Sequence, residues 1–189
     1  MKLYVLNLFI SCIVLFLVAC GNAVTSLPKE VIDFEFTSQD NKRSSLKEFD
    51  NKWWIANFMY TNCTFVCPTT MPNLSNVQNN LQELDLDIQI ISFSVDPSND
   101  SPKILREYIE EYQVNTNNWS FLTGYSFEDI QKLSEDFFDT VLEGGGPTEN
   151  EFVHSTNFFL VSPKGEVIEK YNGLSKKEID IMIDDLKTY

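Results

Sequence analysis

The sequence has little positive charge. Its 14 lysine and arginine residues face 28 aspartate and glutamate residues, which gives a formal net charge of −14 at pH 7 with histidine neutral. A chain with this balance is poorly suited to the phosphate backbone of nucleic acids, so we expect no nucleic-acid partner. The acidic surface favours solubility and concentrates cations near the protein.

Several common active-site patterns are also missing from the sequence. It contains no Ser/His/Asp set, no phosphate-binding glycine loop, no dinucleotide fingerprint and no internal repeat. Histidine occurs once, at His154, and cysteine four times. These few residues are therefore the first candidates for any chemistry.

Two of the cysteines, Cys12 and Cys20, lie in an N-terminal segment that resembles a lipoprotein signal. Leu3 to Ala19 is apolar and uncharged, follows Lys2 and ends in small residues, which is typical of a secretory signal. The ending Leu17-Val18-Ala19-Cys20 resembles the bacterial lipobox, and this resemblance implies cleavage before Cys20 and a diacylglycerol thioether on its sulfur.

We therefore predict a lipoprotein signal peptide over residues 1–19, a lipidated tether over residues 20–30 and one folded domain over residues 31–189. The alternative is an uncleaved membrane anchor, although the apolar stretch is short for a membrane span. Both alternatives place the domain outside the cytoplasmic membrane. We expect a lipid-anchored protein on the outer face of a bacterial cytoplasmic membrane.

The other two cysteines, Cys63 and Cys67, stand between a predicted strand and a predicted helix. The uncharged run Trp53 to Tyr60 predicts a strand buried on both faces. Pro68 predicts the first turn of a helix, because proline is well tolerated there, and Pro72 favours a slightly later start. The amide groups at a helix start favour thiolate over thiol, which is the form that attacks disulfides and binds metal.

The spacing of the pair leaves several interpretations open. On one helical turn, residues four apart lie close enough for a small adjustment to close a disulfide or to bind one soft metal ion. The alternative is a plain structural disulfide or two inert core thiols. A loop of this length constrains the unfolded chain little, and a secreted domain with one close pair more often uses it for chemistry. The pattern does not indicate which cysteine attacks first.

The remaining segments predict a mixed α/β domain. Alternation over residues 31–37 predicts a first strand, and strands at 88–95 and 120–123 alternate with helices that begin near residues 68, 102 and 127. Residues 152–161 and 166–171 predict a late hairpin, and a last helix follows at 175–186. A two-cysteine motif after the first central strand is typical of a thioredoxin-like fold, here with an extra N-terminal strand pair.

His154 gains importance beside the cysteine pair. It follows the segment Gly144 to Pro147, which we expect to be a flexible loop, and it is expected to begin the late hairpin strand. Two thiolates and one imidazole can bind Cu(I) or Cu(II), and Zn²⁺ can use the same set with water as a fourth ligand. Among the divalent first-row metals, copper binds such sites with the highest affinity.

The sequence resembles the Sco/SenC family over residues from about Val31 to the C-terminus. Four motifs carry the resemblance, and they occur in the family's order: Thr61 to Pro68, Ser94 to Pro102, Trp119 to Gly124, and Val153 to Ser155. Thioredoxins have two residues between their cysteines, whereas this chain has three.

The resemblance implies a membrane-attached, thioredoxin-like protein that helps to assemble the CuA site of cytochrome c oxidase. It implies Cys63, Cys67 and His154 as copper ligands, with cytochrome c oxidase subunit II as the partner. Asp96 and Asp100 fall in the family's acidic loop and are expected to be accessory residues, or alternatively an acidic turn that caps the next helix.

Three functions remain open at this point. The first is a copper metallochaperone for CuA. The second is a thiol–disulfide oxidoreductase in which Cys63 and Cys67 reduce the same partner with electrons from an unidentified thiol reductant. The third is a redox or copper sensor. We expect a monomer, and the sequence does not indicate whether metal links two copies.

Overall fold

A computed structural model describes residues 33–144 and 151–189. The predicted signal peptide, Cys20 and the tether lie outside the described residues, as does most of the predicted glycine loop. In the described part, no helix is long and apolar enough to cross a membrane.

A mixed seven-stranded sheet forms the centre of the fold, in the order β2-β1-β5-β4-β3-β8-β9. The inner strands β3, β4 and β5 run parallel, whereas β1, β2, β8 and β9 pair antiparallel with their neighbours. Their bounds are β1 Glu35–Ser38, β2 Arg43–Ser45, β3 Trp54–Met59, β4 Gln89–Ser94, β5 Trp119–Thr123, β8 Asn157–Val161 and β9 Val167–Asn172. The predicted inner strands, N-terminal strand pair and late hairpin are confirmed.

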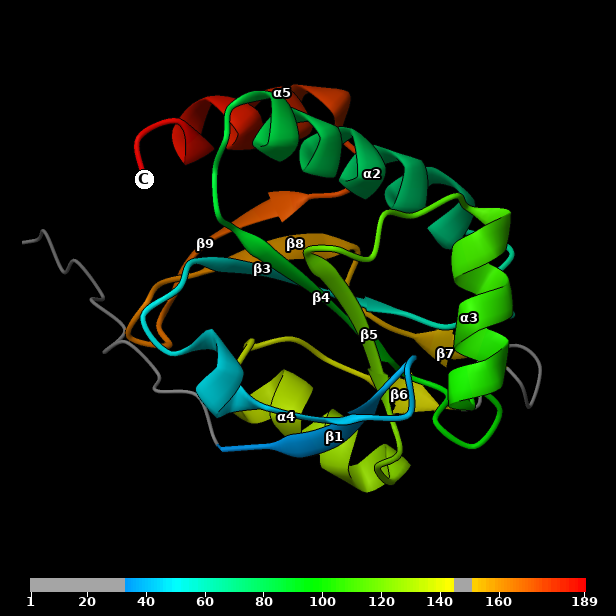
Figure 1. The fold of residues 1–189 in the computed structure, drawn as a ribbon. Helices are drawn as coiled ribbons and strands as arrows, with labels where there is room; N and C mark the ends of the chain where they lie inside the picture. Colours follow the sequence, from blue (N-terminus) through cyan, green and yellow to red (C-terminus); the bar gives the residue numbers. More distant parts are fainter. Residues whose placement is uncertain (1–32, 145–150) are drawn as a thin grey trace, which may run out of the picture.

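Helices cover both faces of the sheet (Figure 1). Helices α2 (Cys67–Glu83) and α5 (Lys176–Leu186) pack side by side on one face, and α4 (Phe127–Asp136) lies on the other. Helix α3 (Pro102–Glu111) connects β4 to β5. Every residue of β3 is buried, as its uncharged sequence predicts for a central strand between two layers.

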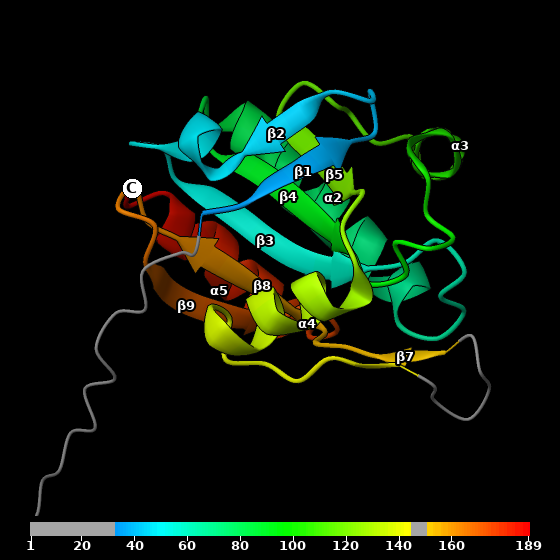
Figure 2. The same cartoon turned by 90° about the horizontal axis from the view of Figure 1, so that it is seen from below.

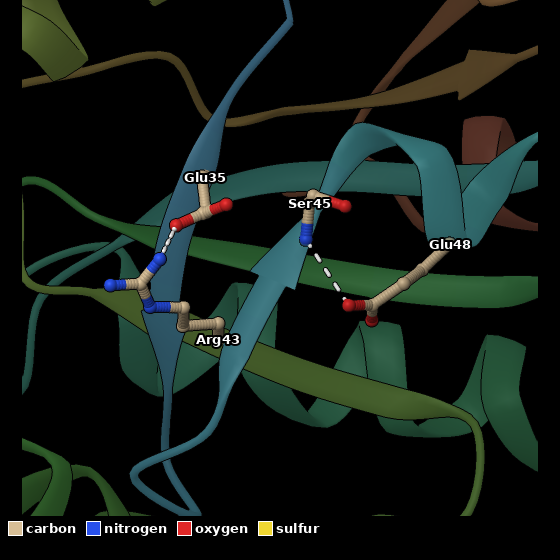
Figure 3. A network of polar contacts seen from close by, with 4 residues as sticks. All are labelled: Glu35, Arg43, Ser45 and Glu48. Atoms are coloured by element: carbon tan, nitrogen blue, oxygen red, sulfur yellow. Dashed lines mark hydrogen bonds and ion pairs between the residues drawn. The ribbon is translucent and has the colours of Figure 1, made fainter.

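Exposed polar contacts lie within the N-terminal strand pair and at the start of the next element (Figure 3). Arg43 on β2 pairs with Glu35 on β1, and the Glu48 carboxylate accepts a hydrogen bond from the Ser45 amide at the start of the 3-10 helix η1 (Leu46–Phe49). Exposed ion pairs contribute little to stability. We therefore attribute the position of this segment mainly to the buried side chain of Phe49.

Two local predictions are wrong. Residues 152–161 do not form one strand, because β7 (Phe152–Val153) pairs with β6 (Glu143–Gly144) in a separate two-stranded sheet and β8 begins only at Asn157. His154 therefore lies between two strands and not at the start of the hairpin.

Helix α2 begins at Cys67, before the start that Pro72 favoured. Pro72 lies inside the helix, near enough to its start for few backbone hydrogen bonds to be lost. Cys67 and Met71 are both fully buried, so the first turn is held against the core.

Candidate metal and redox site

Cys63 and Cys67 lie where β3 passes into α2, as predicted, but they do not share a helical turn. Cys63 is in the turn after β3, where its amide donates to the Tyr60 carbonyl at 3.1 Å, and Cys67 is the first residue of the helix. Both are free thiols. The predicted proximity is confirmed, but the interpretation that both occupy one helical turn is wrong.

The Cys63 sulfur contributes a polar contact that the helix start otherwise lacks. Val66 stands at the N-cap position and its side chain makes no capping hydrogen bond. The Cys67 amide instead donates to the Cys63 sulfur at 3.5 Å. A helix start favours negative charge, so this contact stabilises a thiolate at Cys63.

The two cysteines differ strongly in acidity. The hydrogen bond from the Cys67 thiol is the largest cause that lowers the pKa of Cys63 to about 3, against the opposing effect of burial, and backbone hydrogen bonds lower it further. The same hydrogen bond, together with burial and the charge on Cys63, raises the pKa of Cys67. Cys63 is therefore the thiolate and Cys67 the thiol that donates to it.

His154 presents an unpartnered nitrogen to this pair. Its Nδ1 lies 2.9 Å from the Ser155 carbonyl oxygen, which can only accept, so Nδ1 carries the proton. Nε2 is buried and has no hydrogen-bond partner among the described residues. In the neutral ring, Nε2 thus keeps a free lone pair, which is the donor that a metal requires.

The three side chains form one cluster of donor atoms. One ligand atom from each of Cys63, Cys67 and His154 lies within 4.8 Å of the others. Tyr60, at the end of the β3 region, packs edge to face against His154 with ring centroids 5.8 Å apart, and against Phe152 at 5.2 Å. Tyr60 therefore holds the segment with His154 against the cysteine turn.

Asp96 and Asp100 do not belong to the ligand cluster, and neither of them is the N-cap of the next helix. Ser101, and not Asp100, caps α3. Asp96 organises its own turn by accepting hydrogen bonds from the Ser98 hydroxyl at 2.8 Å and the Asn99 amide at 3.3 Å. Neither carboxylate belongs to the three-residue donor cluster found among the described residues.

Asp100 connects two loops under the site. Its fully buried carboxylate accepts hydrogen bonds from the Thr61 amide at 3.1 Å and hydroxyl at 2.5 Å, and from the Ser94 hydroxyl at 2.6 Å. Burial raises the pKa of Asp100, although these hydrogen bonds oppose the shift. The role of Thr61, two residues before Cys63, was not predicted, because nothing in the sequence indicates this distant partner.

An apolar groove of about 320 Å³ opens beside Cys63. Both views place β7 next to the loop that follows β3 (Figures 1 and 2). The lining consists of Tyr60, Cys63, Phe65, Val66, Glu151, Phe152, Val153 and His154. Cys67 does not line it, so Cys63 is the accessible member of the pair. Phe65 was not singled out from the sequence, although an aromatic residue between two reactive cysteines was the signal that could have identified it.

Comparisons with family models, curated proteins and solved structures all identify the same protein family. A family model described as SCO1/SenC matches residues 23–189. The SCO1 protein homolog of Bacillus subtilis (strain 168) is 38% identical over 181 residues, covering 93% of this chain and 92% of that protein. A SCO1/SenC family lipoprotein from Bacillus anthracis str. Ames has a TM-score of 0.80 and 38% identity, covering 87% of this chain and 97% of the solved chain.

Two further solved structures bear on the chemistry of such sites. BsSco, described as a member of the Sco family of cytochrome c oxidase assembly proteins with a disulfide switch, has a TM-score of 0.77 and 37% identity over 86% of this chain and 94% of its own. Bradyrhizobium japonicum ScoI, solved with copper bound, has a TM-score of 0.70 and 25% identity over 85% of this chain and 99% of its own.

Proposed function

Because the chain belongs to the SCO1/SenC family, we propose that it is a copper-binding assembly factor that delivers copper to the CuA site of cytochrome c oxidase subunit II. The observation that carries this proposal is the cluster of Cys63, Cys67 and His154, whose donor atoms lie within 4.8 Å of one another. The description of BsSco as a cytochrome c oxidase assembly protein supports the choice of partner.

The donor set fits copper. Two thiolate sulfurs are soft ligands that favour Cu(I), and imidazole accepts Cu(I) or Cu(II). The Nε2 atom of His154 is buried without a partner among the described residues, a costly arrangement that a bound ion would relieve. Zinc can use the same ligands, but copper stands above zinc in the order of divalent-ion affinities.

Copper is the cargo in this proposal, and its release follows from the unequal exposure of the ligands. Cys63 is 7% exposed and lines the groove, whereas Cys67 is fully buried. An incoming thiolate from the partner therefore reaches the Cys63 side first. Cys67 is displaced last, because it lies behind Cys63 at the helix start.

A second function is favoured by the unequal acidity of the cysteines. The Cys63 thiolate attacks a disulfide of the CuA site, forms a mixed disulfide and releases one partner thiolate, which takes a proton. Cys67 then loses its proton, attacks the Cys63 sulfur and releases the second partner thiol, which leaves Cys63 and Cys67 oxidised. Recycling requires a thiol reductant, and this step does not need His154. A sensor function would use the same site without transfer.

The proposed location is the outer face of a bacterial cytoplasmic membrane, reached through a lipid on Cys20. The description of the Bacillus anthracis relative as a lipoprotein supports this proposal. We further propose that residues 1–19 are a cleaved signal, that residues 20–30 are a tether, and that the chain acts as a monomer toward subunit II.

The experiment uses the full-length chain with Cys12 and Cys20 replaced by serine, so that Cys63 and Cys67 are the remaining thiols. We would titrate this reduced background protein with copper under anaerobic conditions. We would then mix the loaded protein with a reduced, copper-free CuA domain and follow the appearance of the CuA absorption. Reduction of the oxidised domain by copper-free protein would be measured in parallel, with His154→Ala and Cys63→Ser variants in both assays.

Copper delivery predicts one copper per chain and strong loss of binding and transfer in both variants. A thiol reductase predicts reduction that survives His154→Ala and is lost in Cys63→Ser. Weak copper binding combined with that second pattern would overturn the delivery proposal. Tight copper binding without transfer or reduction would assign the chain to the sensor class.

A further inference from the structure

The groove beside Cys63 has more apolar surface than the chemistry of the three donor residues requires. Phe65 is 74% exposed and Val153 is 52% exposed, and both line the groove. A large aromatic side chain at this exposure makes little contribution to the core, and clustered exposed apolar residues typically mark an interaction site. Phe65 also lies between the two cysteines, so whatever covers it lies against the reactive sulfur.

Charge is scarce in the lining. Glu151 is the one acidic residue in the described lining, which contains no lysine or arginine, although the chain as a whole carries 28 acidic and 14 basic side chains. A groove with this lining provides apolar contacts and little electrostatic selection. It suits an apolar side chain of a partner better than a charged one.

One wall of the groove is extended backbone. Residues 152 and 153 form β7, which has β6 as its single strand neighbour in the described part of the chain. Strands with a free edge commonly bind extended peptide segments, in which alternate side chains fill pockets. The volume of about 320 Å³ is that of a small ligand pocket and admits only a few side chains.

We propose that this groove, lined by Phe65, Val66, Phe152 and Val153, is a docking site for an extended segment of a protein partner that carries a cysteine flanked by apolar residues. The proposal rests on the proposed function and names the chemistry by which the partner is recognised. Apolar flanking side chains occupy the groove and place the partner sulfur against Cys63. Phe65 and Val153 act as specificity residues and do not bind the metal.

Other occupants fit less well. A membrane surface offers no sulfur to Cys63, and a chain of net charge −14 is repelled by anionic headgroups. A second copy of the chain would bring its own Cys63, which lies inside its own groove and is only 7% exposed.

The test measures the rate at which Cys63 captures cysteine peptides. The full-length chain is used with Cys12, Cys20 and Cys67 replaced by serine, so that Cys63 is the single thiol. Two short peptides carry one cysteine each, flanked either by leucine and phenylalanine or by serine and glycine, and each cysteine is activated as a mixed disulfide with thionitrobenzoate. The Cys63 thiolate attacks the peptide sulfur, forms the new disulfide and releases thionitrobenzoate, which is followed by its absorbance.

We expect capture of the apolar peptide to be about tenfold faster than capture of the polar one, equivalent to about 1.4 kcal/mol. Phe65→Ala and Val153→Ser should each reduce this preference severalfold. Ile168→Ala, at a 43% exposed residue on the edge strand β9 that does not line the groove, is the matched control and should leave the preference unchanged. The rate with the free reagent dithiobis(nitrobenzoate) should be the same in all four proteins.

Equal rates for the two peptides, or a preference that survives Phe65→Ala, would overturn the proposal. So would an equal slowing of the free reagent by Phe65→Ala, because Phe65 would then act on the thiol itself. A Phe65-dependent Cys63–Cys63 dimer without peptide preference would assign the groove to a second copy and also overturn it.

Copper titration of the same variants with Cys67 restored separates this proposal from the proposed function. Loss of peptide preference in Phe65→Ala with unchanged copper binding supports the docking site. Absence of copper binding with an intact peptide preference would count against the proposed function alone.

Discussion

At the scale of single residues, Cys63 and Cys67 carry the same side chain in two different environments. Cys63 faces the groove and accepts hydrogen bonds from the Cys67 amide and thiol. Cys67 is fully buried and donates to Cys63. The sequence predicts a reactive pair at a helix start, but it cannot rank the two, because their order of acidity depends on which sulfur accepts.

The acidity of Cys63 gives a direct prediction for the metal-free background protein. Because the pKa of Cys63 is lowered to about 3, its rate of alkylation by iodoacetamide should stay nearly constant between about pH 5 and about pH 8. Cys67→Ala removes the largest cause of the lowered pKa. In that variant the rate should fall with decreasing pH, by about tenfold per unit once the pH is below the new pKa.

A pH-dependent rate in the background protein that matches an ordinary thiol would contradict this assignment. A flat pH profile in both proteins would show that Cys67 is not the main cause of the lowered pKa of Cys63. Mass spectrometry of the alkylated peptide identifies the modified cysteine in each case.

At the scale of elements, the site depends on three loops that the sheet brings together. The order of the strands places the end of β3 beside the end of β4 and beside β8, so the cysteine turn meets the β4–α3 loop and the segment before β8. The apolar runs of β3 and β4 and the periodic patterns of α3 and α5 were sufficient to predict these elements. The short β6–β7 pair was missed, because two-residue strands carry too little pattern to be recognised.

The contact between Asp100 and Thr61 predicts how strongly two of these loops are coupled. Asp100→Asn replaces a carboxylate that accepts several hydrogen bonds by an amide whose NH2 group faces other donors. We expect a loss of about 1–3 kcal/mol in the free energy of unfolding. Asp87→Asn is the control, because Asp87 accepts one hydrogen bond, from Gln89 at an exposed position, and its replacement should change stability by less than about 0.5 kcal/mol.

The contribution of Asp100 to the free energy of unfolding changes with pH in a defined direction. Burial raises the pKa of Asp100, so the native chain retains this proton to higher pH than the unfolded chain does. The stability that the group contributes is fully present below the pKa of the unfolded chain and is lost as the pH rises through the raised pKa. The difference between wild type and Asp100→Asn should therefore narrow from acidic to neutral pH in chemical unfolding experiments, and a widening difference would contradict the assignment.

At the scale of the whole molecule, the donor side chains come from two distant parts of the chain, the cysteine turn and the segment before β8. Cys63 follows a central strand, Cys67 begins α2, and His154 precedes β8. The order of the four sequence motifs indicated the Sco/SenC family, and that resemblance implied these three residues as copper ligands. The free Nε2 of His154 could not be predicted, because it follows from the contact between Nδ1 and the Ser155 carbonyl.

If copper binds Cys63, Cys67 and His154 as we propose, it should stabilise the entire fold, because the three ligands come together only in the native state. At a free copper concentration about 1,000 times the dissociation constant, the native state gains about 4 kcal/mol. For a domain of this size, this corresponds to a rise of about 10 °C in the midpoint of thermal unfolding. His154→Ala should reduce the rise clearly, whereas an equal rise in that variant would indicate that the metal binds elsewhere.

The most direct test of the proposed copper site is copper X-ray absorption spectroscopy of the reduced background protein loaded with one equivalent of Cu(I). We predict two sulfur scatterers and one imidazole nitrogen, with loss of the imidazole signal in His154→Ala and loss of one sulfur in Cys63→Ser. A spectrum without imidazole, or one that His154→Ala leaves unchanged, would contradict the assignment of Cys63, Cys67 and His154 as the copper ligands.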